Sequence, residues 1–221
     1  MKAYILFVRG TYRARQIEYY KRLCRGKQRI AVDGGYSFFK RSGFVPDVLL
    51  GDLDSARGLP KKFSPQTKVV RFPVRKDKTD SQLAVEYCVE QEARSIDIVM
   101  PSIGDMDHYL GNIMFLTAPV IARWVKAGGT IRILNTKGEL RFVKDGGVIF
   151  RLAVGDSVSV IPISKKIILS CTGTDYDVKS VSIVRGESRS LRNRVRTRRA
   201  VFTVGGEAFI WRGFDDKSPK S

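Results

Sequence analysis

The chain has 221 residues, which suits one large domain or two modest ones, and 43% of them are hydrophobic, which is too many for a disordered chain. No apolar run is long enough to span a membrane. The formal net charge of +18 predicts attraction to phosphate-bearing substrates or nucleic acid, or a merely solvated basic surface, and it indicates nothing about the fold.

The cysteines and the first residues indicate the compartment. Cys24, Cys88 and Cys171 are an odd number at wide spacing, which fits neither a disulfide framework nor a metal site. The first ten residues are apolar but short, and they lack the small-residue cleavage pattern of a signal peptide. We therefore expect a first strand there and a protein of the reducing cytoplasm.

The first half alternates segments typical of strands and of helices. We expect strands at residues 3–8, 29–33, 48–50, 68–72, 96–100 and 131–134. We expect helices at residues 13–25, 79–93 and 108–126, the last interrupted or kinked near Pro119. This alternation predicts a mostly parallel, Rossmann-like α/β sheet with helices on its faces.

After about residue 135 the pattern changes to short strands, and no helical periodicity of useful length remains. The turn signals KDGG, AVGD and VGGE separate several of them. We expect strands at residues 140–143, 148–152, 157–161, 167–170, 178–184, 200–204 and 208–211. The second half therefore predicts an antiparallel β-sandwich or barrel, and the two domains are expected to comprise residues 1–136 and 137–221.

Acidic residues follow two of the strands predicted in the first half. Asp33 precedes two glycines, whereas Asp52 and Asp54 stand between Gly51 and Ser55. Ligands of an open parallel sheet bind beyond the carboxyl ends of its strands, so both groups are expected at one crevice. Two carboxylates this close repel each other unless a cation such as Mg²⁺ neutralises them. The alternative is a pair of solvated loop aspartates.

The motif KDKTD, residues 76–80, lies between a predicted strand and a predicted helix. Thr79 can cap the helix, whose free N–H groups and partial positive charge favour phosphate. Lys76 or Lys78 adds a point charge, and Asp80 in the first turn could reach the same metal as the preceding motif. The alternative is an ordinary capped helix start with exposed charges.

A third polar cluster again lies between a strand and a helix. It contains Asp105, Asp107, His108 and Asn112. His108 is the only histidine, and a lone histidine is more often a hydrogen-bonding fixture than a base or a ligand. Asn112 is one helical turn further on and shares its face.

Arginine is concentrated near the end of the chain, at positions 185, 189, 192, 194, 196, 198 and 199. Arg192, Arg194, Arg196 and Arg198 alternate, so on a strand they would share one face. Nucleic-acid binding is one interpretation, but no aromatic platform accompanies these arginines, and the acidic motifs would repel nucleic acid. A solvated basic face is the other interpretation.

These motifs resemble the thiamine pyrophosphokinase family. The matching runs are AVDGGYSFFKRSGFVPDVLLGDLDS (31–55), FPVRKDKTDSQLAV (72–85) and DHYLGN (107–112), and their order and spacing agree with the family. In the second half the resemblance is looser. Residues 173–176 resemble the glycine-to-aromatic segment of the family, and Asn193 falls where the family has a Ser-Asn pair.

The resemblance implies a catalytic α/β domain that binds ATP and Mg²⁺, a β-sandwich that binds substrate, and a homodimer. The substrate site would lie between the α/β domain of one subunit and the sandwich of the other. The implied reaction transfers the β,γ-diphosphate of ATP to the hydroxyl of thiamine and releases AMP.

The resemblance also assigns roles to the matching residues. The expected magnesium ligands are Asp52, Asp54 and Asp80. The phosphates would be bordered by Lys76, Asp77 and Thr79. Beyond the resemblance, we expect Lys78 to add charge beside them and Asp77 or Asp80 to accept the hydroxyl proton. The remaining site residues would be Asp33 and Ser55 in the pocket wall, Asp107 and Asn112 completing the site, Tyr176 stacking on the pyrimidine, and Asn193. His108 is a further candidate because of its place beside Asp107.

Two positions depart from the family. Residues 103–105 read Ile-Gly-Asp where the family usually has Gly-Gly-Arg, so an arginine expected to meet phosphate is replaced by Asp105. Arg192 replaces a serine and would sit poorly beside cationic thiamine. The alternatives are therefore a diphosphokinase for another alcohol, such as a hydroxymethylpterin, and a nucleotide- or nucleic-acid-binding protein that has lost catalysis.

Overall fold

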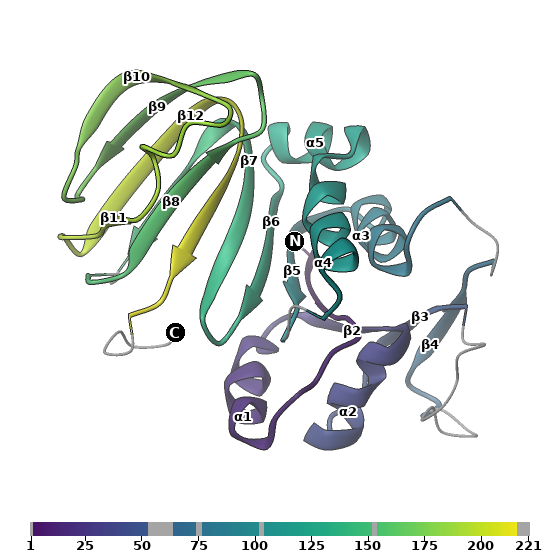
Figure 1. Ribbon diagram of the computed structural model, residues 1–221. Coiled ribbons are helices and arrows are strands. Elements are labelled where there is room, and N and C mark those ends of the chain that lie inside the picture. The colour runs from purple at the N-terminus through teal and green to yellow at the C-terminus, as the bar shows by residue number, and fades with distance from the viewer. Residues whose placement is uncertain (1, 53–63, 74–76, 102–103, 152–153, 216–221) are drawn as a thin grey trace. The chain divides into compact units, whose positions relative to one another are not determined.

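The computed structural model describes residues 2–52, 64–73, 77–101, 104–151 and 154–215 (Figure 1). The chain forms two compact units. Unit 1 comprises Met1–Trp124 and Gly129–Thr136, and unit 2 comprises Val125–Gly128 and Lys137–Ser221. Within these described ranges, no helix is both long and apolar enough to cross a membrane.

The described part of unit 1 is built on six parallel strands, as the alternating pattern predicts. They are β1 (Lys2–Phe7), β2 (Gln28–Val32), β3 (Val48–Gly51), β4 (Lys68–Arg71), β5 (Ala93–Val99) and β6 (Thr130–Asn135). Their order in the sheet is β6-β5-β1-β2-β3-β4. The chain therefore reverses its direction of travel across the sheet between β1 and β5, which is the position where open α/β sheets bind ligands.

Helices connect these strands. They are α1 (Ala14–Leu23), the 3₁₀-helix η1 (Asp33–Gly35), α2 (Tyr36–Ser42), α3 (Asp80–Glu90), α4 (Met106–Met114), the 3₁₀-helix η2 (Phe115–Thr117) and α5 (Pro119–Lys126). The predicted helix of residues 108–126 is thus interrupted just before Pro119, as expected. Helix α3 ends at Glu90, so β5 begins three residues earlier than predicted. Helix α2 was not predicted.

An aromatic core holds α1 and α2 against the sheet. Phe7 at the end of β1 stacks on Phe38 of α2, with ring centroids 3.8 Å apart. Tyr12 is buried, and its hydroxyl donates to the carbonyl oxygen of Val8 at 2.6 Å. Tyr20 of α1 meets the edge of the Tyr12 ring. These contacts fix the segment that leaves β1, next to the position where the strand order reverses.

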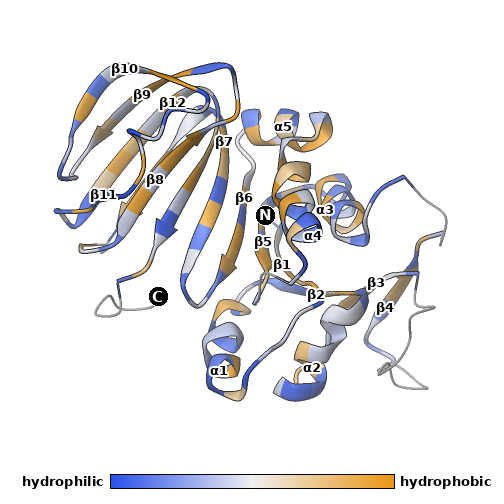
Figure 2. Ribbon diagram, viewed as in Figure 1, coloured by the Kyte–Doolittle hydropathy of each residue, from blue (hydrophilic) through white to orange (hydrophobic). Residues whose placement is uncertain are grey.

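Unit 2 is antiparallel, as predicted. Its strands are β7 (Gly138–Arg151), β8 (Ser157–Pro162), β9 (Lys166–Thr172), β10 (Val178–Val184), β11 (Asn193–Arg194) and β12 (Arg199–Gly213). The first half of β12 pairs with β9 and its second half with β8, while β7 pairs along its whole length. The change of partner places two layers around one apolar core that includes Val160, Leu169 and Phe202. Along β7, hydrophilic and hydrophobic stretches alternate (Figure 2).

Two of the predicted turns are wrong. The sequences KDGG and VGGE lie inside the long strands β7 and β12, opposite each other, with Gly146 paired to Val204. The register shifts between Val204 and Glu207, and the side chain of Asp145 accepts a hydrogen bond from the Gly206 N–H at 2.8 Å. The glycines therefore form a bulge where β12 changes partner. The four strands predicted on either side of these glycines are in fact the two long strands β7 and β12.

The arginine run does not form one strand face. Between Arg192 and Arg198 the only strand is Asn193–Arg194, Arg192 has a φ of 58°, and Val195 makes a single bridge to Thr174. Arg196 forms an ion pair with Asp175. The prediction of a shared arginine face is wrong because left-handed backbone at Arg192 and local hydrogen bonding after Arg194 break the extended geometry.

Candidate active site

The segments that follow β1, β2 and β3 pack closely at the carboxyl edge of the unit 1 sheet. A Cβ on Gly35 would lie 1.7 Å from the carbonyl oxygen of Phe7, so only glycine fits there. A Cβ on Gly51, whose φ is +155°, would lie 3.3 Å from the Cα of Asp33. Asp33 therefore lies against the end of β3, beside the half-buried Asp52.

Arg9 is a residue at this edge that our sequence reasoning missed. It follows β1, where the strand order reverses, and its Nη2 lies 3.4 Å from Oδ2 of Asp33. The side chain of Arg9 is 71% exposed and lies across Gly34, because a Cβ on Gly34 would be 2.8 Å from the arginine Nε. The rule that identified Asp33 and Asp52, a polar residue just beyond a buried strand, would also have found Arg9.

The start of α3 has the predicted cap. The Thr79 hydroxyl oxygen accepts a hydrogen bond from the Gln82 N–H at 3.2 Å, and Asp80 is the first residue of the helix. Lys78 donates to the Glu86 carboxylate at 2.6 Å, so much of its charge is neutralised by α3 itself. Asp77 is exposed. Strand β4 precedes α3, and its neighbour β3 precedes Asp52. The start of α3 and Asp52 therefore follow neighbouring strands of the sheet.

The start of α4 carries the third polar cluster. Asp105 occupies the cap position, but its side chain makes no capping hydrogen bond. The Asp107 carboxylate accepts a hydrogen bond from the His108 backbone N–H at 2.8 Å, while the side chain of His108 is exposed and Asn112 is half-buried. This cluster follows β5, the neighbour of β1 on the other side of the reversal point.

Two of the three predicted magnesium ligands, Asp52 and Asp80, lie in the described part of the chain. Asp52 and Asp80 are both half-buried and follow neighbouring strands of the sheet. Across the described ranges, no group of three or more His, Cys, Asp or Glu side chains could hold a metal. Mg²⁺ does not need such a group, because it usually binds one or two carboxylates together with phosphate oxygens and waters. The predicted residues Asp54, Ser55 and Lys76 lie outside the described residues.

The two predicted residues of unit 2 lie together. The Asn193 carboxamide oxygen accepts from the Tyr176 N–H at 3.2 Å, and its nitrogen donates to the Tyr176 carbonyl oxygen at 3.0 Å and to the Thr174 hydroxyl at 2.9 Å. Tyr176 is 76% exposed and is therefore no core residue. Tyr176 and Asn193 line a mostly apolar cavity of about 200 Å³, together with Val178, Leu191 and other residues.

Arg192 lines a different cavity of unit 2. This second cavity, of about 590 Å³, is lined by Arg192, Arg194 and Asp215 among others, and Asn193 is not part of its wall. Arg189 does line the cavity of Tyr176, but its guanidinium is paired with Glu187 at 3.2 Å. Adjacent residues of the chain thus contribute to separate cavities.

Known proteins resemble this chain in sequence and in structure. The family model described as "Thiamin pyrophosphokinase, catalytic domain" matches residues 20–125. A thiamine pyrophosphokinase of Bacillus subtilis (strain 168) is 28% identical over 180 residues, which are 79% of this chain and 81% of that protein.

Two solved structures extend the resemblance to both units. The crystal structure of thiamine pyrophosphokinase from Bacillus subtilis has a TM-score of 0.78 at 26% identity, with 96% of this chain and 99% of that chain covered. The yeast thiamin pyrophosphokinase has a TM-score of 0.73 at 11% identity, with 99% and 88% covered, and shows the same fold. These likenesses confirm the predicted combination of an α/β sheet and an antiparallel β-domain.

Proposed function

Because this chain belongs to the thiamin pyrophosphokinase family, we propose that it is a thiamine diphosphokinase, which transfers the diphosphate of ATP to the hydroxyl of thiamine and releases AMP. The observation that carries this proposal is the family match over residues 20–125. This segment holds Asp33, Asp52, Asp77, Asp80 and Asp107, all of which follow strands of one parallel sheet.

The ATP phosphates are proposed to bind at the carboxyl edge of the unit 1 sheet. The first turn of α3 offers backbone N–H groups and a partial positive charge to them. Arg9 adds a guanidinium, which suits phosphate because its N–H groups can bind two oxygens at once. Lys78 contributes less than its position suggests, because Glu86 already pairs with it.

Asp52 and Asp80 are proposed to hold Mg²⁺, together with Asp54. When bound, the ion neutralises phosphate charge during transfer. The acceptor hydroxyl attacks the β-phosphorus, and the bond to the α-phosphate oxygen breaks, so AMP leaves. Asp77 or Asp80 accepts the hydroxyl proton. A strong base is not required, because this kind of transfer depends chiefly on positioning and electrostatics.

Arg9 is proposed to compensate for the departure at Asp105. The family arginine would follow β5, whereas Arg9 follows β1, and these two strands are neighbours in the sheet. Arg9 therefore places a cation after β1, across the reversal point from Asp105. This cation replaces the positive charge of the family arginine for which Asp105 is substituted. Asp33 keeps this guanidinium at the edge of the sheet.

The acceptor is proposed to bind at the cavity of Tyr176 and Asn193. The exposed ring of Tyr176 offers a flat face to a heteroaromatic ring, and Asn193 fixes the backbone that carries it. The charge of Arg192 is directed to another cavity, and that of Arg189 is offset by Glu187, so neither repels cationic thiamine strongly. This arrangement supports thiamine as the acceptor.

A homodimer is proposed from the apolar face of α4. Met106, Leu110 and Met114 are spaced four residues apart and are 62%, 51% and 49% exposed. A helix face of this kind is costly in water and is typical of an interaction surface.

We propose a cytoplasmic location as well, because Cys24, Cys88 and Cys171 are free, buried thiols.

The proposed reaction is tested by following the individual phosphates. Purified protein is incubated with Mg²⁺, thiamine and ATP labelled in the β-phosphate. The label is expected in thiamine diphosphate, with unlabelled AMP as the other product. Label retained in ADP, with thiamine monophosphate as the product, would contradict diphosphate transfer.

A further inference from the structure

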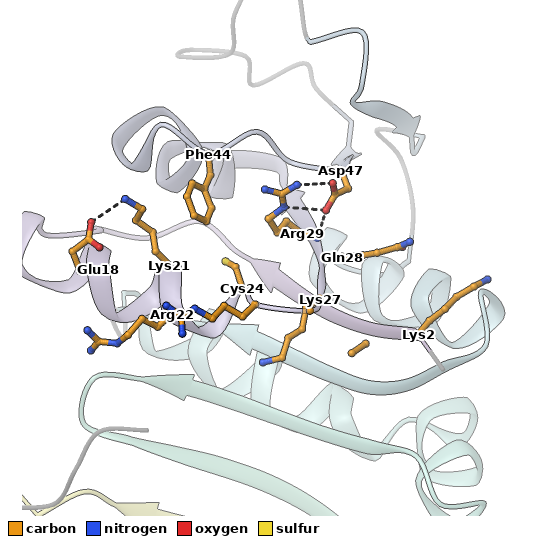
Figure 3. Close-up of a pocket in the computed structure, with 13 residues that line it drawn as sticks. Lys2, Glu18, Lys21, Arg22, Cys24, Lys27, Gln28, Arg29, Phe44 and Asp47 are labelled. Carbon is orange, nitrogen blue, oxygen red and sulfur yellow. Dashed lines mark hydrogen bonds and ion pairs between the residues drawn. The ribbon is translucent and has the colours of Figure 1, made fainter.

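A basic cavity lies at the amino-terminal edge of the unit 1 sheet, and we call it the amino-edge cavity (Figure 3). Its volume is about 800 Å³, which lies in the range of small-molecule sites. The walls come from the starts of β1 and β2, from the end of α1 with its following turn, and from residues Phe44 and Asp47 before β3. The catalytic residues proposed above follow the opposite ends of these strands.

The charge of this cavity is strongly positive. Six basic side chains and two carboxylates line it, the basic ones being Lys2, Lys21, Arg22, Arg25, Lys27 and Arg29. Three of the cations are paired: Lys21 with Glu18 at 2.9 Å, Arg29 with Asp47 at 2.8 Å, and Lys27 with Asp97 at 2.6 Å. Figure 3 shows the first two of these pairs as dashed lines.

The other three cations have no such partner. Within the described ranges, no ion pair joins Lys2, Arg22 or Arg25 to a carboxylate, and all three residues are exposed. They come from the start of β1, the last turn of α1 and the turn after α1, yet they line one cavity. Like charges brought together around a concave surface repel one another, and a bound anion relieves this repulsion.

The remaining groups favour binding over covalent chemistry. Burial raises the pKa of the Cys24 thiol to about 11, although Arg29 and Lys27 act in the opposite direction. The thiol therefore stays protonated, and it donates to the Tyr20 carbonyl oxygen at 3.4 Å. Phe44 gives the cavity an aromatic wall, with the Lys21 Nζ 5.3 Å from the ring centroid.

We propose that the amino-edge cavity is a second anion site, which binds the oligophosphate group of a small ligand through Lys2, Arg22 and Arg25. Several phosphates match three unpaired cations and this volume better than one phosphate does. Strand β1 has six residues, so the two edges of the sheet are separated by roughly 20 Å. A phosphate group held at one edge does not reach the other, and the site is independent of the proposed catalysis.

The test is a nuclear magnetic resonance titration of the full-length, ¹⁵N-labelled protein with inorganic tripolyphosphate in metal-free buffer. The amide signals of Gly26, Lys27 and Gln28 report on the cavity. The test variant is Arg22→Gln/Arg25→Gln. The matched control is Lys40→Gln/Arg41→Gln, which removes two exposed cations from the last turn of α2. Lys2→Gln is a second test variant that leaves every helix unchanged.

We expect saturable shifts at the three amides, binding weakened about tenfold by the double test variant, and unchanged binding by the control. The proposal is overturned if these amides do not shift or if test and control variants lose affinity equally. An oligonucleotide that shifts the same amides at much lower concentration would also overturn it, in favour of nucleic acid. AMP release by the test variants should stay normal, so failure of this proposal is distinguishable from failure of the proposed function.

Discussion

The guanidinium of Arg9 lies 3.4 Å from the carboxylate of Asp33, although the two residues follow different strands of the sheet. The ion pair brings a cation to an edge where Asp33, Asp52, Asp80 and Asp105 all carry negative charge. Because Arg9 remains 71% exposed, this pair contributes little to stability. The ion pair instead holds a guanidinium at the edge of the sheet where phosphate is proposed to bind.

Replacing Arg9 should impair the use of ATP more than the fold. We expect Arg9→Ala to lower kcat/KM for ATP by roughly tenfold or more, since a hydrogen bond to a charged group is worth about 1.5–3 kcal/mol. Steady-state kinetics with ATP as the varied substrate measure this effect. Arg41→Ala, an exposed arginine of α2, is the control and should be neutral.

The position of Asp105 provides a complementary test of Arg9. We expect Arg9→Ala/Asp105→Arg to recover part of the lost kcat/KM, because the second change returns a cation to the neighbouring strand end. The same kinetics, run on both single variants and the double variant, give the coupling between the two sites. Strictly additive losses would argue against compensation.

Asp52→Asn should abolish most magnesium-dependent turnover while the protein stays folded. An amide keeps the shape of the side chain but removes the charge that attracts the ion. Turnover measured over a range of Mg²⁺ concentrations, together with the melting temperature, separates the two effects. Near-normal turnover in this variant would remove Asp52 from the metal site.

Tyr176→Ala should raise the KM for thiamine by roughly tenfold, as expected when a ring-stacking contact is lost. Tyr176→Phe keeps the ring and should change the KM little, because the hydroxyl is not needed for stacking. The KM for ATP should stay constant in both variants. Equal effects of the two substitutions would show that the hydroxyl, and not the ring, is the important group.

Asp97 should make the stability of unit 1 sensitive to acid. Burial acts to raise the pKa of this carboxyl, but hydrogen bonds and charges from Arg132 and Lys27 lower it below its ordinary value. Its stabilising effect is therefore present above the unfolded pKa, at about pH 4, and is lost as the pH falls through the folded pKa. We expect Asp97→Asn to lower the free energy of unfolding by about 3 kcal/mol at pH 7, and by much less near pH 2.

Urea denaturation at both pH values measures this difference. Glu18→Gln is the control, because Glu18 is 73% exposed and its variant should differ little from the natural protein at either pH. A deficit of Asp97→Asn that is equally large at pH 2 would contradict a role for the charged carboxylate.

The sequence was most informative where structure depends on local signals. Strands of a parallel sheet are buried on both faces, so β1 and β3 stand out as continuous apolar runs, and Thr79 marks the start of α3. Helix α2 was missed because it is only seven residues long and lies between Gly35 and Gly43. The fused strands β7 and β12 were missed because a glycine bulge and a turn look alike until the partner strand is known.

The polar residues also differ in whether a local sequence signal marks them. Asp33 and Asp52 were predicted as site residues because each directly follows a recognisable strand. Arg9 follows one as well, but the prediction of a magnesium site drew on carboxylates alone. The amino-edge cavity could not be predicted, because its unpaired cations come from separate segments and each reads alone as an ordinary surface charge.

The most direct measurement is AMP release from ATP and Mg²⁺ by the purified protein, with thiamine, a hydroxymethylpterin or no acceptor added. The proposed function predicts AMP only with thiamine, and Asp52→Asn should release almost none. AMP formed only with the pterin would keep the diphosphate transfer but contradict the acceptor. No AMP with any acceptor would contradict the proposed activity itself.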